Sequence, residues 1–97
     1  MNATPAAWES WNKYIDNVDC KRYEYMLTLS AEVKVLLGAH LTQKGSAGWH
    51  VLINAFNPFA GEYVDFEGDF PTFAEAEIMA WKQAQEAIEA RIKGRVK

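Results

Sequence analysis

The apolar positions along the chain follow two different periods, and the changes between them predict the order of the elements. Near the N-terminus, apolar residues recur at the three-to-four-residue spacing of a helix: Ala7, Trp8, Trp11, Ile15 and Val18. Thr4-Pro5 is a typical helix start, because a hydroxyl N-cap is followed by proline at the first helical position. We therefore expect a helix over about residues 5–17.

From Tyr23 the period changes to two, which is typical of a strand with one buried face. As far as Leu41 the odd positions are apolar, and most of the even positions are polar. The pattern predicts either one long bent strand over about 23–43 or two strands with a break near Ser30-Ala31. Gly38 is a candidate bulge in this stretch.

Two shorter strands are expected at about 49–56 and 62–67, on either side of the turn "NPFAGE". In the strand at about 49–56, odd-numbered and even-numbered positions are both apolar. Either both faces of this strand are covered, or one apolar face is exposed to solvent. The second face defines an apolar patch of Leu52 and Phe56, with Phe59 in the turn that follows. The N-terminal helix could cover this patch. If it does not, the patch is a candidate protein interface, since aromatic residues are enriched in such surfaces.

At Thr72 the period returns to that of a helix. "TFAE" is a capping box, in which the Thr72 hydroxyl and the Glu75 carboxylate cap the first turn. Alanines and isoleucines then form an inward stripe, which predicts a helix over about 72–92. The chain is therefore expected to be a single α+β domain of order α-β-β-β-α. Its three-stranded antiparallel sheet would pack against an N-terminal helix and a long C-terminal helix.

This layout resembles the double-stranded-RNA-binding domain, which has a helix, a three-stranded antiparallel sheet and a second long helix. That family opens its second helix with a lysine-rich motif that grips phosphates. Here the same place reads "TFAEAE" from Thr72 to Glu77, without a base, so RNA binding is not carried over. The piece "GWHVLINAF…YVDFEGDFPTFAEAE" also resembles strand–strand–helix modules of phage and mobile-element proteins, which implies a small accessory protein of that origin.

Composition narrows the class of protein. The chain has 97 residues, enough for one domain, and a net charge of −3, which argues against a general nucleic-acid binder. Cys20 is the only cysteine, so neither a disulfide framework nor a metal-type cysteine pair is possible. No signal peptide or membrane-spanning run is visible. We expect a cytoplasmic protein that does not bind membranes.

Carboxylates are concentrated around the start of the last helix, and no Lys or Arg lies between Lys44 and Lys82. We name this set the acidic rim: Glu62, Asp65, Glu67, Asp69, Glu75 and Glu77. It is a candidate docking face for a basic protein surface. The alternative is a solvated face, part of which caps the helix and complements its dipole. Calcium loops need a turn and more oxygen ligands than the strand carboxylates offer, so we predict no metal and no cofactor.

The remaining chemistry-bearing residues have structural alternatives. His40 and His50 are expected on strands in structural roles, and Cys20 is expected to be unreactive in a loop. The C-terminal bases could complement the helix dipole or contact nucleic acid: Arg91, Lys93, Arg95 and Lys97.

No nucleotide-binding, zinc-protease or hydrolase motif is present, so we expect no enzyme. The leading hypothesis is a non-catalytic protein-binding module, a phage-encoded inhibitor or modulator of a host nucleic-acid-handling enzyme. It would dock through the acidic rim and the apolar patch. The alternative is a small nucleic-acid-binding domain that uses the basic C-terminal tail and the sheet aromatics. A third class is an oligomeric structural protein.

Overall fold

The computed structural model describes residues 8, 10–57 and 61–96. Five strands, one short 3₁₀ turn and one long helix follow one another: β1 (Asn12–Asp16), β2 (Cys20–Thr28), β3 (Lys34–Gln43), η2 (Gly45–Ala47), β4 (Trp49–Asn57), β5 (Gly61–Phe70) and α1 (Phe73–Val96).

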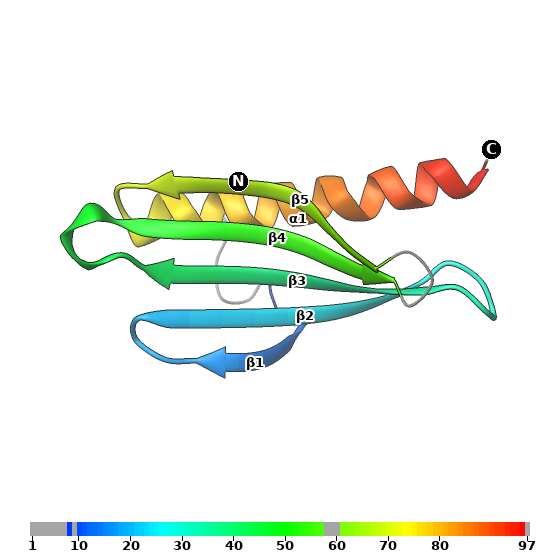
Figure 1. Ribbon diagram of the computed structural model, residues 1–97, viewed down its shortest axis with the longest axis horizontal. Coiled ribbons are helices and arrows are strands. Elements are labelled where there is room, and N and C mark those ends of the chain that lie inside the picture. The colour runs from blue at the N-terminus through cyan, green and yellow to red at the C-terminus, as the bar shows by residue number, and fades with distance from the viewer. Residues whose placement is uncertain (1–7, 9, 58–60, 97) are drawn as a thin grey trace.

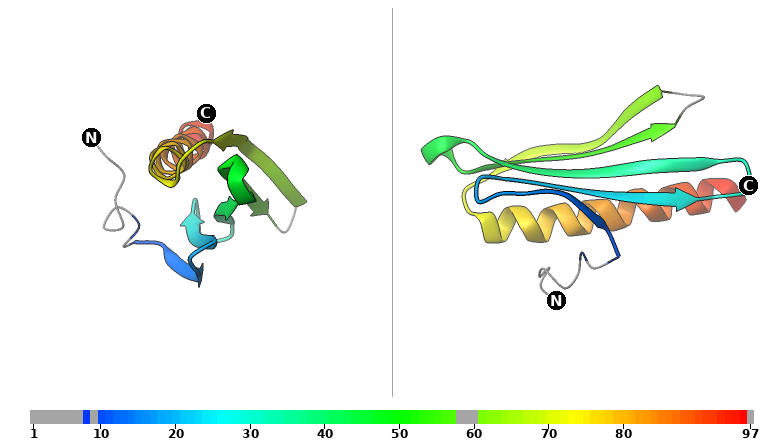
Figure 2. Two further views of the ribbon diagram at one scale, coloured as in Figure 1. Left: turned by 90° about the vertical axis from the view of Figure 1, so that its left-hand side faces the viewer. Right: turned by 90° about the horizontal axis from the view of Figure 1, so that it is seen from below.

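The strands form one antiparallel sheet in which each strand pairs with the next along the chain, in the order β1-β2-β3-β4-β5. Helix α1 runs along one face of this sheet (Figure 1) and contacts β3, β4 and β5. Toward their shared hairpin, β4 and β5 curve away from the helix (right-hand view of Figure 2). The fold is therefore a two-layer arrangement, with one sheet face against α1.

The alternation in the sequence places the core between the sheet and α1. In β2, β3 and β4 the buried side chains are odd-numbered: Tyr23, Leu27, Val35, Leu37, Ala39, Leu41, Trp49, Val51, Ile53 and Ala55. Helix α1 presents a buried stripe of small side chains, which allows its backbone to lie close to the sheet: Ala76, Ala80, Ala84 and Ala87.

The expected start of the C-terminal helix is confirmed. The Glu75 amide donates a hydrogen bond to Thr72 Oγ1 at 3.2 Å, and the Thr72 hydroxyl donates to the Glu75 carboxylate at 3.2 Å. These contacts partner one of the otherwise free amides of the first turn. The helix extends to Val96, four residues beyond the expected end.

The expected order α-β-β-β-α is wrong, and the order in the structure is β-β-β-β-β-α. Of the helix expected over 5–17, residues 12–16 form strand β1, and residues 1–7 and 9 lie outside the described part. Trp8 and Trp11 are buried on the core side of the sheet. Trp8 stacks on Tyr23 at 4.5 Å between ring centroids and meets Trp81 edge-on at 5.0 Å. The helix-first layout behind the resemblance to the RNA-binding domain is therefore not found.

Between Tyr23 and Leu41, the two-strand alternative is confirmed. The chain turns near Ser30, where the Leu29 amide donates to the Val33 carbonyl oxygen at 2.9 Å and the Val33 amide donates to Ser30 Oγ at 3.1 Å. The expected bulge at Gly38 is wrong, because Gly38 pairs in regular register with β2 and β4. The three-stranded sheet is corrected to five strands by this hairpin and by β1.

Candidate functional site

The face of the sheet that points away from α1 is the candidate site, and we name it the open face. In the described ranges 10–57 and 61–96, no helix packs against it (Figure 2). The even-numbered residues of β2, β3 and β4 lie on this face, and the strand register decides which of them are neighbours.

Three apolar side chains form one row across the open face. The register places Met26 beside Leu36, and Leu36 beside Phe56. Met26 is 52% exposed and Phe56 is 50% exposed, and Leu36 is half-buried between them. We name these residues the apolar row. The two outer members offer apolar surface to solvent on a face that no helix covers.

A chain of hydrogen bonds crosses four strands beside the apolar row. Arg22 Nε donates to His40 Nδ1 at 2.8 Å, and His40 Nε2 is 3.2 Å from Asn54 Oδ1. Asn54 Nδ2 then donates to Glu62 Oε2 at 2.7 Å. We name these four residues the polar relay. Arginine can only donate and an ionised carboxylate can only accept, so the relay has one direction. His40 must accept at Nδ1 and donate from Nε2.

His40 is held in its neutral form by this environment. Burial lowers the pKa of His40, and the neighbouring Arg22 guanidinium lowers it further. The hydrogen bond to Asn54 and the carboxylates Glu24 and Glu62 oppose the shift without reversing it. Protonation would put a proton on Nδ1, which removes the acceptor for Arg22 and places two cations side by side.

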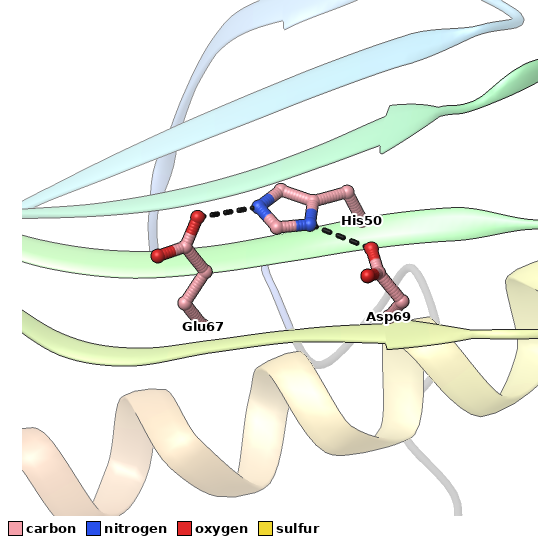
Figure 3. Close-up of polar contacts among 3 residues, drawn as sticks. All are labelled: His50, Glu67 and Asp69. Atoms are coloured by element: carbon pink, nitrogen blue, oxygen red, sulfur yellow. Dashed lines mark hydrogen bonds and ion pairs between the residues drawn. The ribbon is translucent and has the colours of Figure 1, made fainter.

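A second polar cluster lies at the other end of the open face, where His50 of β4 bridges two carboxylates of β5 (Figure 3). His50 Nδ1 is 2.7 Å from Asp69 Oδ1, and His50 Nε2 is 2.9 Å from Glu67 Oε2. We name this arrangement the His50 bridge. Both contacts are hydrogen bonds at the same time only when the imidazole carries two protons, because each carboxylate can only accept.

The His50 bridge does not form a metal site in this geometry. The two ring nitrogens point in different directions, so Glu67 and Asp69 do not converge with an imidazole nitrogen on one point (Figure 3). Within the described part of the chain, no group of three or more His, Cys, Asp or Glu side chains is placed to hold a metal ion. Both His50 nitrogens contact carboxylates in this arrangement.

The structure does not gather the acidic rim on one surface. Glu62, Glu67 and Asp69 lie on the open face, through their contacts with Asn54 and His50. Asp65 lies on the helix side, where it pairs with Arg91. Asp65 is an extra residue in β5, because Ile53 pairs with Phe66 whereas the next residue, Asn54, pairs with Val64. This bulge reverses the side-chain alternation and separates Asp65 from Glu67.

The other two members of the acidic rim belong to α1. Glu75 takes part in the capping contacts with Thr72. Glu77 is only 8% exposed, and its burial raises the pKa of its carboxyl, against the opposing attraction of Lys21. Glu75 therefore belongs to the helix start and Glu77 is buried, so neither extends the charge of the open face.

The other candidate residues are also divided. Leu52 and Phe56 both lie on the open face, with Asn54 of the polar relay between them along β4, and Phe59 lies outside the described residues. Arg91 is engaged by Asp65, and Lys93 is exposed on α1. The side chain of Arg95 and the whole of Lys97 are outside the described part.

Four residues of the open face were not recognised from the sequence as part of the site: Arg22, Leu36, Asn54 and Gly38. Gly38 is the glycine that lies beneath the polar relay. Their even parity in strands was a usable signal, but their proximity depends on the register of three strand pairs. Register is fixed by which face is buried and by the turns, and not by any single residue.

A larger hollow lies on the opposite side of the sheet, near the hairpin tips and the C-terminal half of α1. Its volume is about 820 Å³. Apolar residues form most of its wall, with Arg91 at its rim: Leu29, Val33, Val35, Ala55 and Tyr63.

Comparison with protein-family models, with curated proteins and with solved structures gives no match. Among the described residues, no helix has both the length and the apolar character needed to cross a bilayer.

Proposed function

We propose that this protein is a non-catalytic protein-binding module that docks a partner on the open face of its sheet. The observation that carries the proposal is the position of the apolar row beside a line of carboxylates on the open face. Phe56 and Glu62 are direct neighbours across β4 and β5, and Glu67 and Asp69 continue along the same edge strand. The apolar row thus lies at one end of the open face, with Glu62 beside it and the other carboxylates along the edge strand. Aromatic residues and Met are enriched in protein interfaces, whose rims are polar.

The apolar row alone cannot provide a stable complex. Complete burial of an exposed Phe or Met side chain contributes roughly 1.5–3 kcal/mol, and Met26 and Phe56 are already half-buried. The row would therefore contribute about 2–3 kcal/mol, whereas micromolar affinity requires about 8 kcal/mol. Additional contacts across the open face and electrostatic attraction must supply the rest, which is why the carboxylates belong to the proposed site.

The charge of the open face favours a basic partner. The carboxylates Glu24, Glu62, Glu67 and Asp69 outnumber the bases Arg22 and Lys34 on this face. Charge of this kind mainly accelerates encounter and selects partners. We propose as the partner class a protein whose basic surface binds nucleic acid, and a phage or mobile-element origin remains a prediction.

Affinity capture with matched variants tests the proposal. The bait proteins are the wild type, Met26→Ala/Phe56→Ala, Glu67→Lys/Asp69→Lys, and the control Ile78→Ala/Ile92→Ala. Ile78 and Ile92 are exposed on α1 at 39% and 44%. We expect at least one cytosolic protein that binds the wild type and the control but is depleted on both open-face variants. Equal retention on all four folded baits would contradict the proposal.

The nucleic-acid alternative has weaker support. Base stacking requires exposed aromatic side chains. Trp8, Trp11, Tyr23 and Trp49 are buried, which leaves Tyr14, Phe56 and Tyr63 for this role. Arg91, the first base of the proposed contact, is held by Asp65. Gel shifts at two salt concentrations separate the two functions. A shift that weakens steeply with salt would favour nucleic-acid binding.

A further inference from the structure

The hollow of about 820 Å³ on the helix side of the sheet reaches down to the core, and we name it the helix-side hollow. It lies where β4 and β5 curve away from α1 toward their shared hairpin (right-hand view of Figure 2). Val35 and Ala55 form part of its wall although they are only 4% and 3% exposed. Pockets for small molecules typically have volumes of about 300–1,000 Å³, so the hollow has the size of such a site.

The charged groups that line the helix-side hollow are already compensated. Among the described residues these are Arg91 and Glu62. The Arg91 guanidinium binds both carboxylate oxygens of Asp65, at 3.0 and 3.1 Å, and the Glu62 carboxylate accepts from Asn54 at 2.7 Å. A charged guest would lose its hydration without gaining a free counter-charge, which is unfavourable. An uncharged guest avoids this cost.

The rest of the wall is mostly apolar. Leu29, Val33 and Tyr63 join Val35 and Ala55 around the helix-side hollow. Water beside such side chains finds few hydrogen-bond partners, so an apolar guest that displaces it gains free energy.

We propose that the helix-side hollow is a binding site for one uncharged, largely apolar small molecule. Its volume favours a small molecule over a side chain of a protein partner. An apolar cavity of about 150 Å³ already holds a benzene molecule, so a single ring would leave most of the 820 Å³ empty. The site lies on the opposite side of the sheet from the open face, and the proposal does not depend on the docking function.

The test is a fluorescence titration of the full chain with two probes that share one anilinonaphthalene skeleton. Phenyl-naphthylamine is uncharged, and anilinonaphthalene sulfonate carries a negative charge. We expect the uncharged probe to saturate one site per chain, with a Kd at least tenfold below that of the sulfonate. Equal Kd values for the two probes, or no saturable binding of the uncharged one, would overturn the proposal.

Methyl NMR spectra recorded during the same titration locate the uncharged probe. The methyl resonances of Val33, Val35 and Ala55 should shift with the Kd measured by fluorescence, whereas those of Met26 and Leu36 should not. Larger shifts at Met26 and Leu36 would show that the probe binds the apolar row of the open face, and the helix-side site would then be wrong.

Two pairs of variants assign the binding to this wall. Val33→Asp puts a charge into it and should weaken the uncharged probe at least tenfold, whereas Val64→Asp is the control at a position that does not line the hollow. Because Val33 is half-buried, Tyr63→Ala is a second variant at a position that is 65% exposed. Tyr63→Ala should weaken the probe at least threefold, and Tyr14→Ala, at 58% exposed, is its control. Losses no larger than those of the controls would contradict the assignment.

The ligand site and the docking function fail separately. Met26→Ala/Phe56→Ala changes only the open face, so it should leave the Kd of the uncharged probe unchanged. Probe binding in the helix-side hollow together with equal retention by all capture baits would support the ligand site and contradict docking. Selective capture without saturable probe binding would do the reverse.

Discussion

Arg91 of α1 forms a bidentate ion pair with Asp65 of β5, with nitrogen–oxygen distances of 3.0 and 3.1 Å. The Arg91 guanidinium also donates to the Ala87 carbonyl oxygen at 3.0 Å. Both side chains are largely buried, at 18% and 14% exposed. The pair joins the C-terminal half of the helix to the bulge of the edge strand. Asp65 and Arg91 were both candidates for partner binding from the sequence, but in the structure they stabilise the fold.

Asp65→Asn should destabilise the protein by about 1–3 kcal/mol, because it leaves a largely buried guanidinium without its counter-charge. The measurement is the free energy of unfolding from urea denaturation monitored by tryptophan fluorescence. Glu67→Gln is the control, since it breaks an exposed pair worth about 0–1 kcal/mol. Equal effects of the two substitutions would show that the Asp65–Arg91 pair contributes no more than a surface contact.

Gly48→Ala should be among the most damaging single substitutions outside the core. Gly48 has φ of +108°, and a Cβ there would collide with the Phe70 carbonyl oxygen. Backbone strain and the collision together should cost about 3 kcal/mol. Gly45→Ala is the matched control, because Gly45 also has a positive φ, +58°, but has open space around it. Its cost should be about 1–2 kcal/mol by the same urea measurement.

The parts of the fold that could be predicted from sequence are those with local causes. The helix start is set locally by Thr72, whose hydroxyl accepts from the Glu75 amide and donates to the Glu75 carboxylate. The alternation from Tyr23 to Leu41 correctly assigned the buried face, because period two depends only on the pleat. These signals do not depend on which strands pair with each other.

The parts that failed depend on distant partners. The spacing of Trp8, Trp11 and Ile15 suits a helix, but residues 12–16 pair with β2 as strand β1, and Trp8 stacks on Tyr23. Tertiary contacts of this kind override a weak local preference. Likewise, the contacts of His50 with Glu67 and Asp69 follow from the β4–β5 register, and the bulge at Asp65 has no sequence signature.

Glu77→Gln should gain stability relative to the wild type as the pH rises from 4 to 7. Burial raises the pKa of Glu77 in the folded state above its ordinary value of 4.5, so the folded protein holds this proton more tightly than the unfolded chain does. The wild type therefore loses stability as the pH rises through that raised pKa, and the Gln variant lacks this loss. Urea titrations at three pH values measure the difference.

The exposed Glu86 of α1 provides the control for Glu77. Glu86→Gln, measured in the same urea titrations, shows what removing an exposed carboxylate of the same helix does. A pH dependence of Glu77→Gln no different from that of Glu86→Gln would mean that Lys21 compensates the buried charge completely.

His40 should make the protein less stable in acid. Its folded-state pKa lies below the ordinary 6.5, because it is buried and next to Arg22. In the window between that lowered pKa and about 6.5, the unfolded chain binds more protons than the folded protein, so stability rises with pH. The contribution is complete above about pH 6.5 and is lost as the pH falls through the folded pKa. His40→Gln should therefore flatten the dependence of the free energy of unfolding between pH 7.5 and 5.

An NMR measurement of the His40 ring separates this cause from general acid effects. At pH 7, ¹⁵N shifts should show an unprotonated Nδ1 and a protonated Nε2, as required by the donors and acceptors on either side. Arg22→Gln should raise the pKa of His40, because it removes the neighbouring cation, whereas Lys34→Gln on the same face should change it little. A protonated Nδ1 at pH 7 would contradict the one-way order of the polar relay.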